Sequence, residues 1–262
     1  MATEAVARPA ATILLLRDGA KGLEVFMVVR HHAIDFAAGA LVFPGGRVEE
    51  SDHALAARLG ATDVGATAFR LAAIRETFEE CGVLLARTVG ADAVIDADTL
   101  LRVENEHRAA LNASKIEFGT ILDAHGLVPA TDLLVHYAHW ITPSHQPKRY
   151  DTKFFLAEAP AEHVAVHDGH ESVDSIWISP NDALTGTEEG RYILVFATQL
   201  NLVKLSRFAT VEQAMEAARS STVVTVLPRA TKLDATRRKL LIPIEAGYGG
   251  SEFIVDLPPA SS

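Results

Sequence analysis

Three glutamates lie within five residues in the segment RETFEECGV, which runs from Arg75 to Val83. Carboxylates at this density can form a solvated helix surface, or they can bind a hard divalent cation such as Mg²⁺, which prefers oxygen ligands. Arg75 and Glu79 have the i,i+4 spacing of a weakly stabilising surface ion pair. Glu76 and Glu80 are like charges at the same spacing and oppose the helix. Taken alone, the segment fits both interpretations about equally.

The helical pattern of residues 67–81 separates these carboxylates from an apolar stripe. At about 100° per residue, Glu76, Glu79 and Glu80 share an arc of about 100°. The opposite side of the helix carries Leu71, Ile74, Phe78 and Cys81. The pattern therefore predicts a helix that buries one side, presents carboxylates on the other and ends at Gly82.

Two strand signals and a glycine turn precede this helix. ATILLLRDGAKGLEVFMVVR predicts a β-hairpin over about residues 12–30, and ALVF at 40–43 predicts a short strand that stops at Pro44-Gly45-Gly46. Glycines at a strand end let backbone carbonyls approach a cation or a phosphate closely. A glycine carbonyl with helical glutamates is the oxygen-rich set that Mg²⁺ prefers. This context favours a metal site over a solvated surface.

The rest of the chain alternates between predicted helices and predicted strands. Residues about 96–126 have helical spacing, and strand signals follow in LLVHYAHWITP, RYDTKFFLAEAP and ESVDSIWI, with Pro180 then opening a helix. Helices are predicted near residues 192–205 and in TVEQAMEAARS, and β-like runs in STVVTVL, KLLIPIE and EFIVDL. Mixed strands flanked by helices predict an α/β or α+β sandwich.

Composition excludes several classes of function. The net charge of −10 argues against a nucleic-acid surface, which is normally basic. The apolar runs are too short to cross a bilayer, so we expect no membrane partner. One cysteine permits no intramolecular disulfide, and MATEAVARPA shows no secretory pattern. We expect a cytoplasmic protein.

The residues around the glutamates resemble the Nudix box, G-x5-E-x7-R-E-U-x-E-E-x-G-U, in which U is aliphatic. The matching positions are Gly46, Arg75, Glu76, Glu79, Glu80, Gly82 and Val83. Thr77 stands where the box has its first U. Gly46 and Arg75 are 29 positions apart where the box has 14, so about fifteen residues are inserted, within about 49–65. The first glutamate of the box corresponds to Thr67 when counted from the arginine and to Asp52 when counted from the glycine.

HWITPSHQPKRYDTKFFLAEAP and ESVDSIWISPNDAL extend the resemblance to a Nudix branch with an interrupted box, which includes peroxisomal coenzyme A diphosphatases. The resemblance implies one domain over residues 1–262, a Nudix-type α/β/α sandwich with a mixed sheet. Its core would span about 10–190, with the insert at about 49–65, the helical segment at about 96–126 and a C-terminal extension at about 191–262. The insert and the helical segment could read the substrate or form a homodimer contact.

Nudix hydrolases use Mg²⁺ or Mn²⁺ to direct water at a phosphorus of a nucleoside diphosphate linked to another moiety. The resemblance implies that Glu79 and Glu80 are the main metal ligands and that Glu76 and the Gly46 carbonyl complete the site. Arg75 would orient Glu79. The expected catalytic set is therefore Arg75, Glu76 and Glu79 with a general base.

Glu171, before the strand that carries Trp177, is the candidate base; its alternative is a solvent-exposed loop acid. The candidate substrate-binding residues are Gly45, Arg30, Lys148 and Arg149, of which the last two could instead be a surface basic pair. The spacing of His163, His167 and His170 is compatible with zinc, although a polar loop is the stronger interpretation.

Three functions stay open at this point. The branch resemblance favours hydrolysis of coenzyme A or acyl-coenzyme A to 3′,5′-ADP and phosphopantetheine. A different small-molecule nucleotide diphosphate, such as ADP-ribose or an ADP-sugar, is the alternative. A non-catalytic ligand sensor with the same fold is disfavoured because all three glutamates are present.

Overall fold

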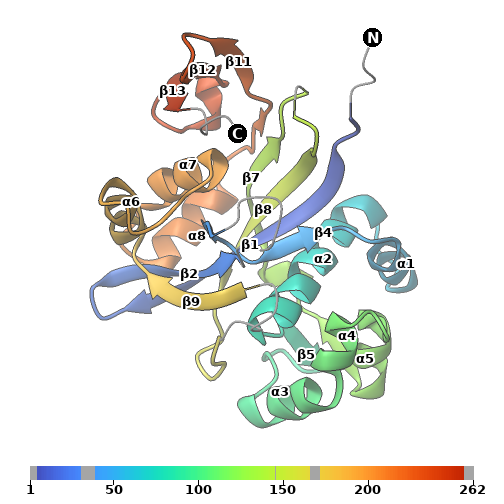
Figure 1. Ribbon diagram of the computed structural model, residues 1–262. Coiled ribbons are helices and arrows are strands. Elements are labelled where there is room, and N and C mark those ends of the chain that lie inside the picture. The colour runs from blue at the N-terminus through green and yellow to red at the C-terminus, as the bar shows by residue number, and fades with distance from the viewer. Residues whose placement is uncertain (1–4, 31–38, 145, 166–171, 257–262) are drawn as a thin grey trace.

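The computed structural model describes residues 5–30, 39–144, 146–165 and 172–256, and its centre is one mixed sheet. The strands of this sheet are β1 (Arg8–Gly19), β2 (Gly22–Arg30), β3 (Leu41–Val42), β4 (Gly45–Arg47), β7 (Val135–Ile141), β8 (Tyr150–Glu158), β9 (Ser172–Ile178) and β10 (Thr225–Val226). They follow the order β10-β7-β8-β1-β2-β3, with β4 added to β1 and β9 to β2. Helices cover both faces (Figure 1), so the predicted α/β/α sandwich is confirmed.

β1 is central because its apolar run can be buried on both faces of the sheet. Ile13 and Leu15 pack into the core on one face, whereas Leu14 and Leu16 pack into the core on the other, as the two-residue period of a strand requires. β1 runs parallel to β8 and forms the predicted antiparallel hairpin with β2.

The predicted short strand does stop before Pro44-Gly45-Gly46, but the two glycines also begin a strand that sequence analysis did not predict. Gly45–Arg47 forms β4, antiparallel to β1, with Gly45 opposite Thr12 and Gly46 opposite Ala11. Gly45 has φ 155°, and a Cβ there would lie 2.4 Å from the Ala11 carbonyl oxygen. Glycine is required because the two backbones approach this closely.

The first face of the sheet is covered by residues 50–124. The helices are α1 (Glu50–Arg58), α2 (Val64–Cys81), α3 (Ala97–Val103), a π-helical turn η1 (Glu104–Arg108), α4 (Ala109–Asn112) and α5 (Phe118–Ala124). The short strands β5 (Ala86–Thr88) and β6 (Leu127–Pro129) pair beside them. The predicted helix at 67–81 is confirmed and begins earlier, where the Asp63 side chain accepts from Ala66 N. It ends at Gly82, which has φ 68°.

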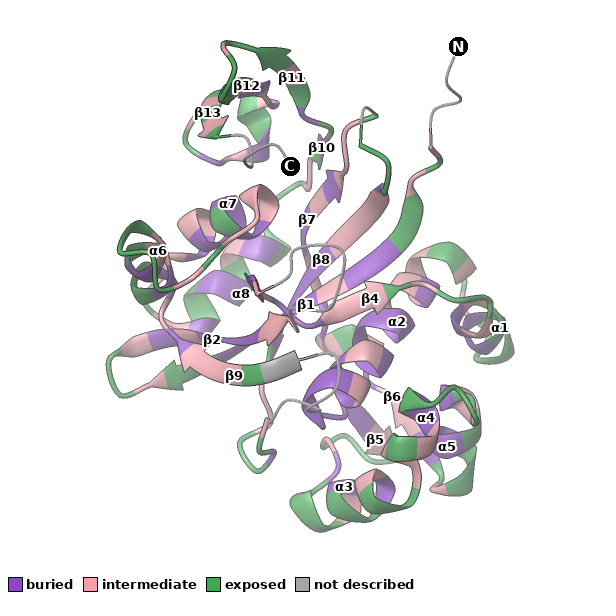
Figure 2. Ribbon diagram, in the orientation of Figure 1, coloured by how far each residue is buried: buried purple, intermediate pink, exposed green. Residues whose placement is uncertain are grey.

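The second face is covered by α6 (Pro180–Glu188), α7 (Phe196–Leu205) and α8 (Val211–Arg219). Figure 2 shows the inward sides of these helices buried against the sheet. The last elements that the structure describes form a three-stranded lobe of β11 (Arg229–Lys232), β12 (Arg237–Leu241) and β13 (Glu252–Asp256). Sequence analysis did not predict β11.

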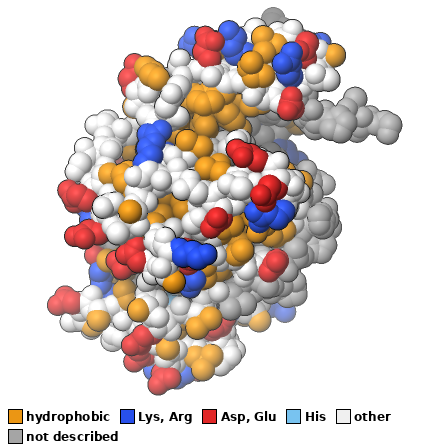
Figure 3. Space-filling view, turned by 90° about the vertical axis from the view of Figure 1, so that its left-hand side faces the viewer, with side chains coloured by type: hydrophobic (Ala, Val, Ile, Leu, Met, Phe, Trp, Pro, Cys, Tyr) orange, Lys and Arg blue, Asp and Glu red, His pale blue; other side chains and the backbone are white. Residues whose placement is uncertain are grey.

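A buried hydrogen-bond chain joins the C-terminal lobe to the sandwich. Trp140 Nε1 on β7 donates to Tyr248 Oη at 2.8 Å, and Tyr248 Oη donates to Asn201 Oδ1 on α7 at 2.9 Å. Figure 3, which faces the α6 and α7 side, shows hydrophobic side chains gathered below the lobe. No helix in the described residues is long and apolar enough to span a membrane.

Candidate active site

Arg75 is the centre of a buried ion-pair network rather than part of a surface pair. Its Nε and Nη2 donate to the two Asp52 oxygens at 3.1 and 3.0 Å. Nη1 donates to Glu76 Oε1 at 2.9 Å and to Glu79 Oε1 at 3.0 Å, and Nη2 also donates to the Arg47 carbonyl at 2.8 Å. These contacts match the five N–H donors of a guanidinium. The Arg75 side chain is only 4% exposed.

Asp52 is the residue of the interrupted box that pairs with the arginine. It lies in the first turn of α1, is 1% exposed, and also accepts from Glu49 N at 2.9 Å. The register counted from Gly46 therefore selects the partner of Arg75, whereas Thr67, the other candidate, lies in the first turns of α2. Most of the inserted residues form the rest of α1 and its connection to α2.

The carboxylate side of α2 is not a solvated face. Glu80 is 6% exposed, and its Oε2 accepts from Gly45 N on β4 at 2.9 Å. The Glu76 and Glu79 side chains are 13% and 21% exposed. A Cβ on Gly46 would lie 2.4 Å from the Glu76 carboxylate, so glycine lets β4 lie directly against the helix.

The electrostatics of this cluster favour bound positive charge. Burial raises the pKa of Glu79 above its ordinary value, although Arg75 opposes the change. Burial alone would lower the pKa of Arg75, but Glu76, Asp52 and Glu79 outweigh it and raise the pKa. Arg75 is one guanidinium among four buried or half-buried carboxylates, those of Asp52, Glu76, Glu79 and Glu80. A divalent cation would reduce their mutual repulsion.

The donor set fits a hard divalent cation such as Mg²⁺ or Mn²⁺. Glu76, Glu79 and Glu80 offer carboxylate oxygens, and Gly46 lies directly against the Glu76 carboxylate. In the structure these carboxylates are held by protein donors, two by Arg75 Nη1 and the third by Gly45 N. A cation bound by all three would draw them together and take over part of these contacts.

A cleft of about 500 Å³ opens over the cluster. Its lining includes five predicted residues outside the carboxylates, namely Gly45, Gly46, Arg75, Arg30 and Lys148. It also includes residues that sequence analysis missed: Thr12, Glu49, Asn112, Ser114, Tyr150 and Thr152. Glu49 is three residues after Gly46, so its closeness in the sequence to the box glycine could have indicated that it lines the cleft. The others come from strands and helices whose cleft-facing positions have no local signature.

Two predicted basic residues line the cleft and one does not. Within the described residues, Arg30 Nε is buried without a hydrogen-bond partner, which suits an anionic ligand. Lys148 is exposed at the cleft lip. Arg149 is buried instead and donates to the carbonyls of Thr142 at 3.0 Å and Ala5 at 2.6 Å. The Arg149 guanidinium thus has backbone partners, and the substrate role predicted for it stays a prediction.

Some predicted residues lie outside the described part of the chain. These are Glu171, the candidate base, and His167 and His170 of the possible zinc spacing. His163 is buried, and its Nε2 lies 2.8 Å from the Ile95 carbonyl oxygen. That contact gives His163 a structural partner.

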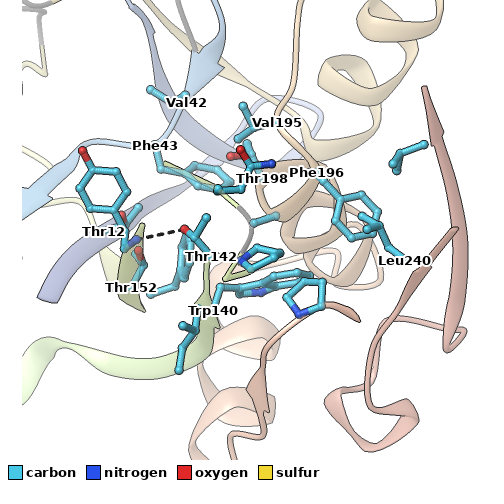
Figure 4. A pocket seen from close by; sticks show the side chains of 18 of the residues that line it. Thr12, Val42, Phe43, Trp140, Thr142, Thr152, Val195, Phe196, Thr198 and Leu240 are labelled. Carbon is cyan, nitrogen blue, oxygen red and sulfur yellow. Dashed lines mark hydrogen bonds between the residues drawn. The ribbon is translucent and has the colours of Figure 1, made fainter. Parts of the chain in front are cut away.

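The cleft continues into an apolar pocket of about 440 Å³ (Figure 4). The two hollows share the lining residues Thr12, Arg30, Gly45, Tyr150 and Thr152. Aromatic and aliphatic walls come from Phe43, Trp140, Phe154, Val195, Phe196, Leu240 and Val255. The C-terminal extension thus builds one wall of a pocket whose other wall is the sheet.

Comparison with known proteins finds a matching family model and several relatives. The family model for the NUDT19 Nudix domain matches residues 56–201. A putative nudix hydrolase 7 of Caenorhabditis elegans is 30% identical over 203 residues, 76% of this chain and 61% of that protein. The acyl-coenzyme A diphosphatase NUDT19 of Xenopus laevis is 24% identical over 234 residues, 72% of this chain and 61% of that protein. The chain therefore spans about 61% of the length of each of these relatives.

A solved structure resembles the chain over most of its length. The NUDIX hydrolase from Alicyclobacillus acidocaldarius matches with a TM-score of 0.65 and 32% identity. The match covers 80% of this chain and 96% of that protein.

Proposed function

The chain belongs to the Nudix hydrolase family, in the group of the NUDT19 Nudix domain, and from this premise we propose that it cleaves the diphosphate of coenzyme A or acyl-coenzyme A. The products would be 3′,5′-ADP and phosphopantetheine or its acyl form. One observation carries the proposal: the buried Arg75 carboxylate network opens on a cleft that continues into an apolar pocket.

Glu76, Glu79, Glu80 and the Gly46 carbonyl would hold Mg²⁺ or Mn²⁺. Such a cation neutralises diphosphate charge, orients water and lowers its pKa. Arg75 fixes the carboxylates of Glu76 and Glu79 through a single nitrogen, Nη1. Asp52 is a positioning residue that acts through Arg75.

Arg30, Lys148 and the backbone of Gly45 would bind the diphosphate. The unsatisfied Arg30 Nε supports this role because a buried donor gains most from a charged acceptor. Glu171 is proposed as the general base on sequence grounds. Glu49 is a second candidate for the base, since it lines the same cleft as Glu79.

The apolar pocket favours coenzyme A over ADP-ribose. Its walls are aromatic and aliphatic, and the hydroxyl-bearing residues Thr142, Thr152 and Thr198 interrupt them. The pantetheine arm likewise alternates methyl and methylene groups with amides, whereas a terminal ribose offers only hydroxyls. The relative from Xenopus laevis is named an acyl-coenzyme A diphosphatase, which supports the same choice.

A substrate panel tests the proposal. The purified protein with Mg²⁺ or Mn²⁺ would be given coenzyme A, acyl-coenzyme A, ADP-ribose, NADH and a diadenosine polyphosphate. The products would then be identified to locate the broken bond. We expect the coenzyme A compounds to have the highest kcat/KM. Preferred cleavage of ADP-ribose would replace the substrate assignment, and binding without hydrolysis of any compound would favour a sensor.

A further inference from the structure

A second cluster of metal-binding side chains lies in the helical segment, on residues that the proposed active site does not use. Glu106 and His107 belong to the π-helical turn η1, and His125 follows the last residue of α5. Glu106 Oε2 lies 3.7 Å from His107 Nε2 and 3.5 Å from His125 Nε2. We propose that these three side chains bind one transition-metal ion of the Zn²⁺ class.

The distances match a shared ion better than a set of hydrogen bonds. All three ligand atoms lie within 4.8 Å of one another, and in the described part of the chain this is the one such group of at least three His, Cys, Asp or Glu residues. Bonds of about 2.0–2.2 Å in a tetrahedron separate neighbouring ligands by roughly 3.3–3.6 Å. The observed separations need only small side-chain movements to reach that range.

His125 supplies a further indication of a ligand. Its Nε2 is buried and makes no hydrogen bond among the described residues, although Glu106 Oε2 lies 3.5 Å away. A buried polar atom without a partner is costly, and a bound ion would satisfy it. The rings of His107 and His125 lie nearly edge to face, with centroids 5.1 Å apart, so both belong to one compact group.

The ligand types select the metal. Two imidazole nitrogens and one carboxylate suit Zn²⁺, Co²⁺ or Ni²⁺, whereas Mg²⁺ prefers an all-oxygen set like the glutamates of α2. The Glu106 side chain is 57% exposed, so water can reach the fourth position. The site is thus chemically distinct from the proposed catalytic one.

An ion here would fix the segment that holds the end of α2. Arg108, next to His107, donates its Nε to the Glu79 carbonyl at 3.1 Å, and Asn112 Nδ2 donates to the same oxygen at 3.2 Å. A metal bound by His107 and His125 would join η1 to the end of α5 and so hold in place the stretch between them, which carries Arg108 and Asn112. Its role would be structural, and π-helical turns are frequent at functional sites.

Cobalt binding to the metal-stripped protein tests the proposal. We expect one equivalent of Co²⁺ to give the intense visible bands of a four-coordinate site, and excess Mg²⁺ to leave them unchanged. His107→Gln and His125→Gln should abolish the bands. His53→Gln on α1 is the matched histidine control, and Glu79→Gln shows that the bands do not come from the α2 carboxylates.

Zn²⁺ should also raise the Tm of the wild-type chain and not that of the His107→Gln variant. Glu106→Gln, at an exposed position that tolerates change, should weaken Co²⁺ binding on the order of tenfold or more. This variant keeps the test decisive if a histidine variant does not fold. Absence of Co²⁺ binding to the wild type, or unchanged binding in the Glu106 and His107 variants, would overturn the proposal.

Discussion

Asp52 and Arg75 are 23 residues apart in the sequence, yet their side chains form a two-pronged buried ion pair. Asp52 lies in the first turn of α1 and Arg75 lies in α2. The ion pair therefore brings together the two parts of the Nudix box that the insertion separates in the sequence. It also leaves Arg75 Nη1 free to bridge Glu76 and Glu79. The orientation of two proposed metal ligands therefore depends on a residue of α1, on the other side of the insertion from Arg75.

Loss of a carboxylate charge on α2 should abolish hydrolysis without unfolding the chain. Glu79→Gln and Glu80→Gln are each expected to lower kcat by at least about 100-fold, because each removes a charged ligand of the cation. Steady-state kinetics over a Mg²⁺ titration measures the effect, and circular dichroism checks the fold. Glu50→Gln, on exposed α1 surface, is the control. Full activity in both variants would mean that the site is misassigned.

Asp52→Ala should destabilise the fold and impair catalysis together. It leaves the Arg75 guanidinium buried with fewer acceptors, which typically costs about 3–5 kcal/mol of unfolding free energy. Urea unfolding measures that loss. Asp52→Glu keeps the charge and should retain more stability and more kcat than Asp52→Ala. Equal loss in both variants would argue against the ion pair as the cause.

Gly46→Ala should displace Glu76 and weaken metal binding. The added Cβ would meet the Glu76 carboxylate at 2.4 Å. We expect a higher Mg²⁺ concentration for half-maximal activity, measured by titration. Gly65→Ala in the first turn of α2 is the matched control: its nearest contact would be 3.5 Å, so it should be neutral or slightly stabilising. An unchanged Mg²⁺ requirement in Gly46→Ala would show that contact between this position and Glu76 does not affect metal binding.

Phe196→Ala should change substrate preference more than catalysis in general. Phe196 lines the apolar pocket and stacks edge to face on Trp140, with centroids 5.9 Å apart. Its loss should raise KM for coenzyme A by about tenfold, the effect of roughly 1–2 kcal/mol of apolar contact. Ile254→Ala on exposed β13 is the control. A uniform fall in kcat for all substrates would place the pantetheine arm elsewhere.

Stability should fall below neutral pH through His136. Burial, with Lys153 nearby, lowers the pKa of His136 to about 4, from an ordinary value of 6.5. As the pH falls, His136 is therefore protonated in the unfolded chain before it is protonated in the folded one. The contribution of neutral His136 to the free energy of unfolding is complete above pH 6.5 and is lost as the pH falls towards 4. We expect a loss of about 2 kcal/mol between pH 7 and 4.5. Urea unfolding of His136→Gln at both pH values should show a smaller difference than the wild type does.

Local patterns in the sequence were sufficient to predict α2 and the arrangement of its glutamates. The 3.6-residue period and Gly82 define the helix and its end, and the period also places Glu76, Glu79 and Glu80 on one side. The β1–β2 hairpin follows from two apolar runs around a short turn. These features depend on residues close in sequence, which is why both the fold class and the Nudix resemblance could be predicted.

Contacts between distant segments decided the rest. Only the folded chain shows that Asp52 rather than Thr67 meets Arg75 and that Gly45–Arg47 pairs with β1. The folded chain was also needed to show that Lys148 is exposed whereas Arg149 is buried, and that α7 and β12 contribute a wall of the apolar pocket. Each of these outcomes depends on which strands pair and which helices pack, and a residue's own neighbours in the sequence carry no record of that choice.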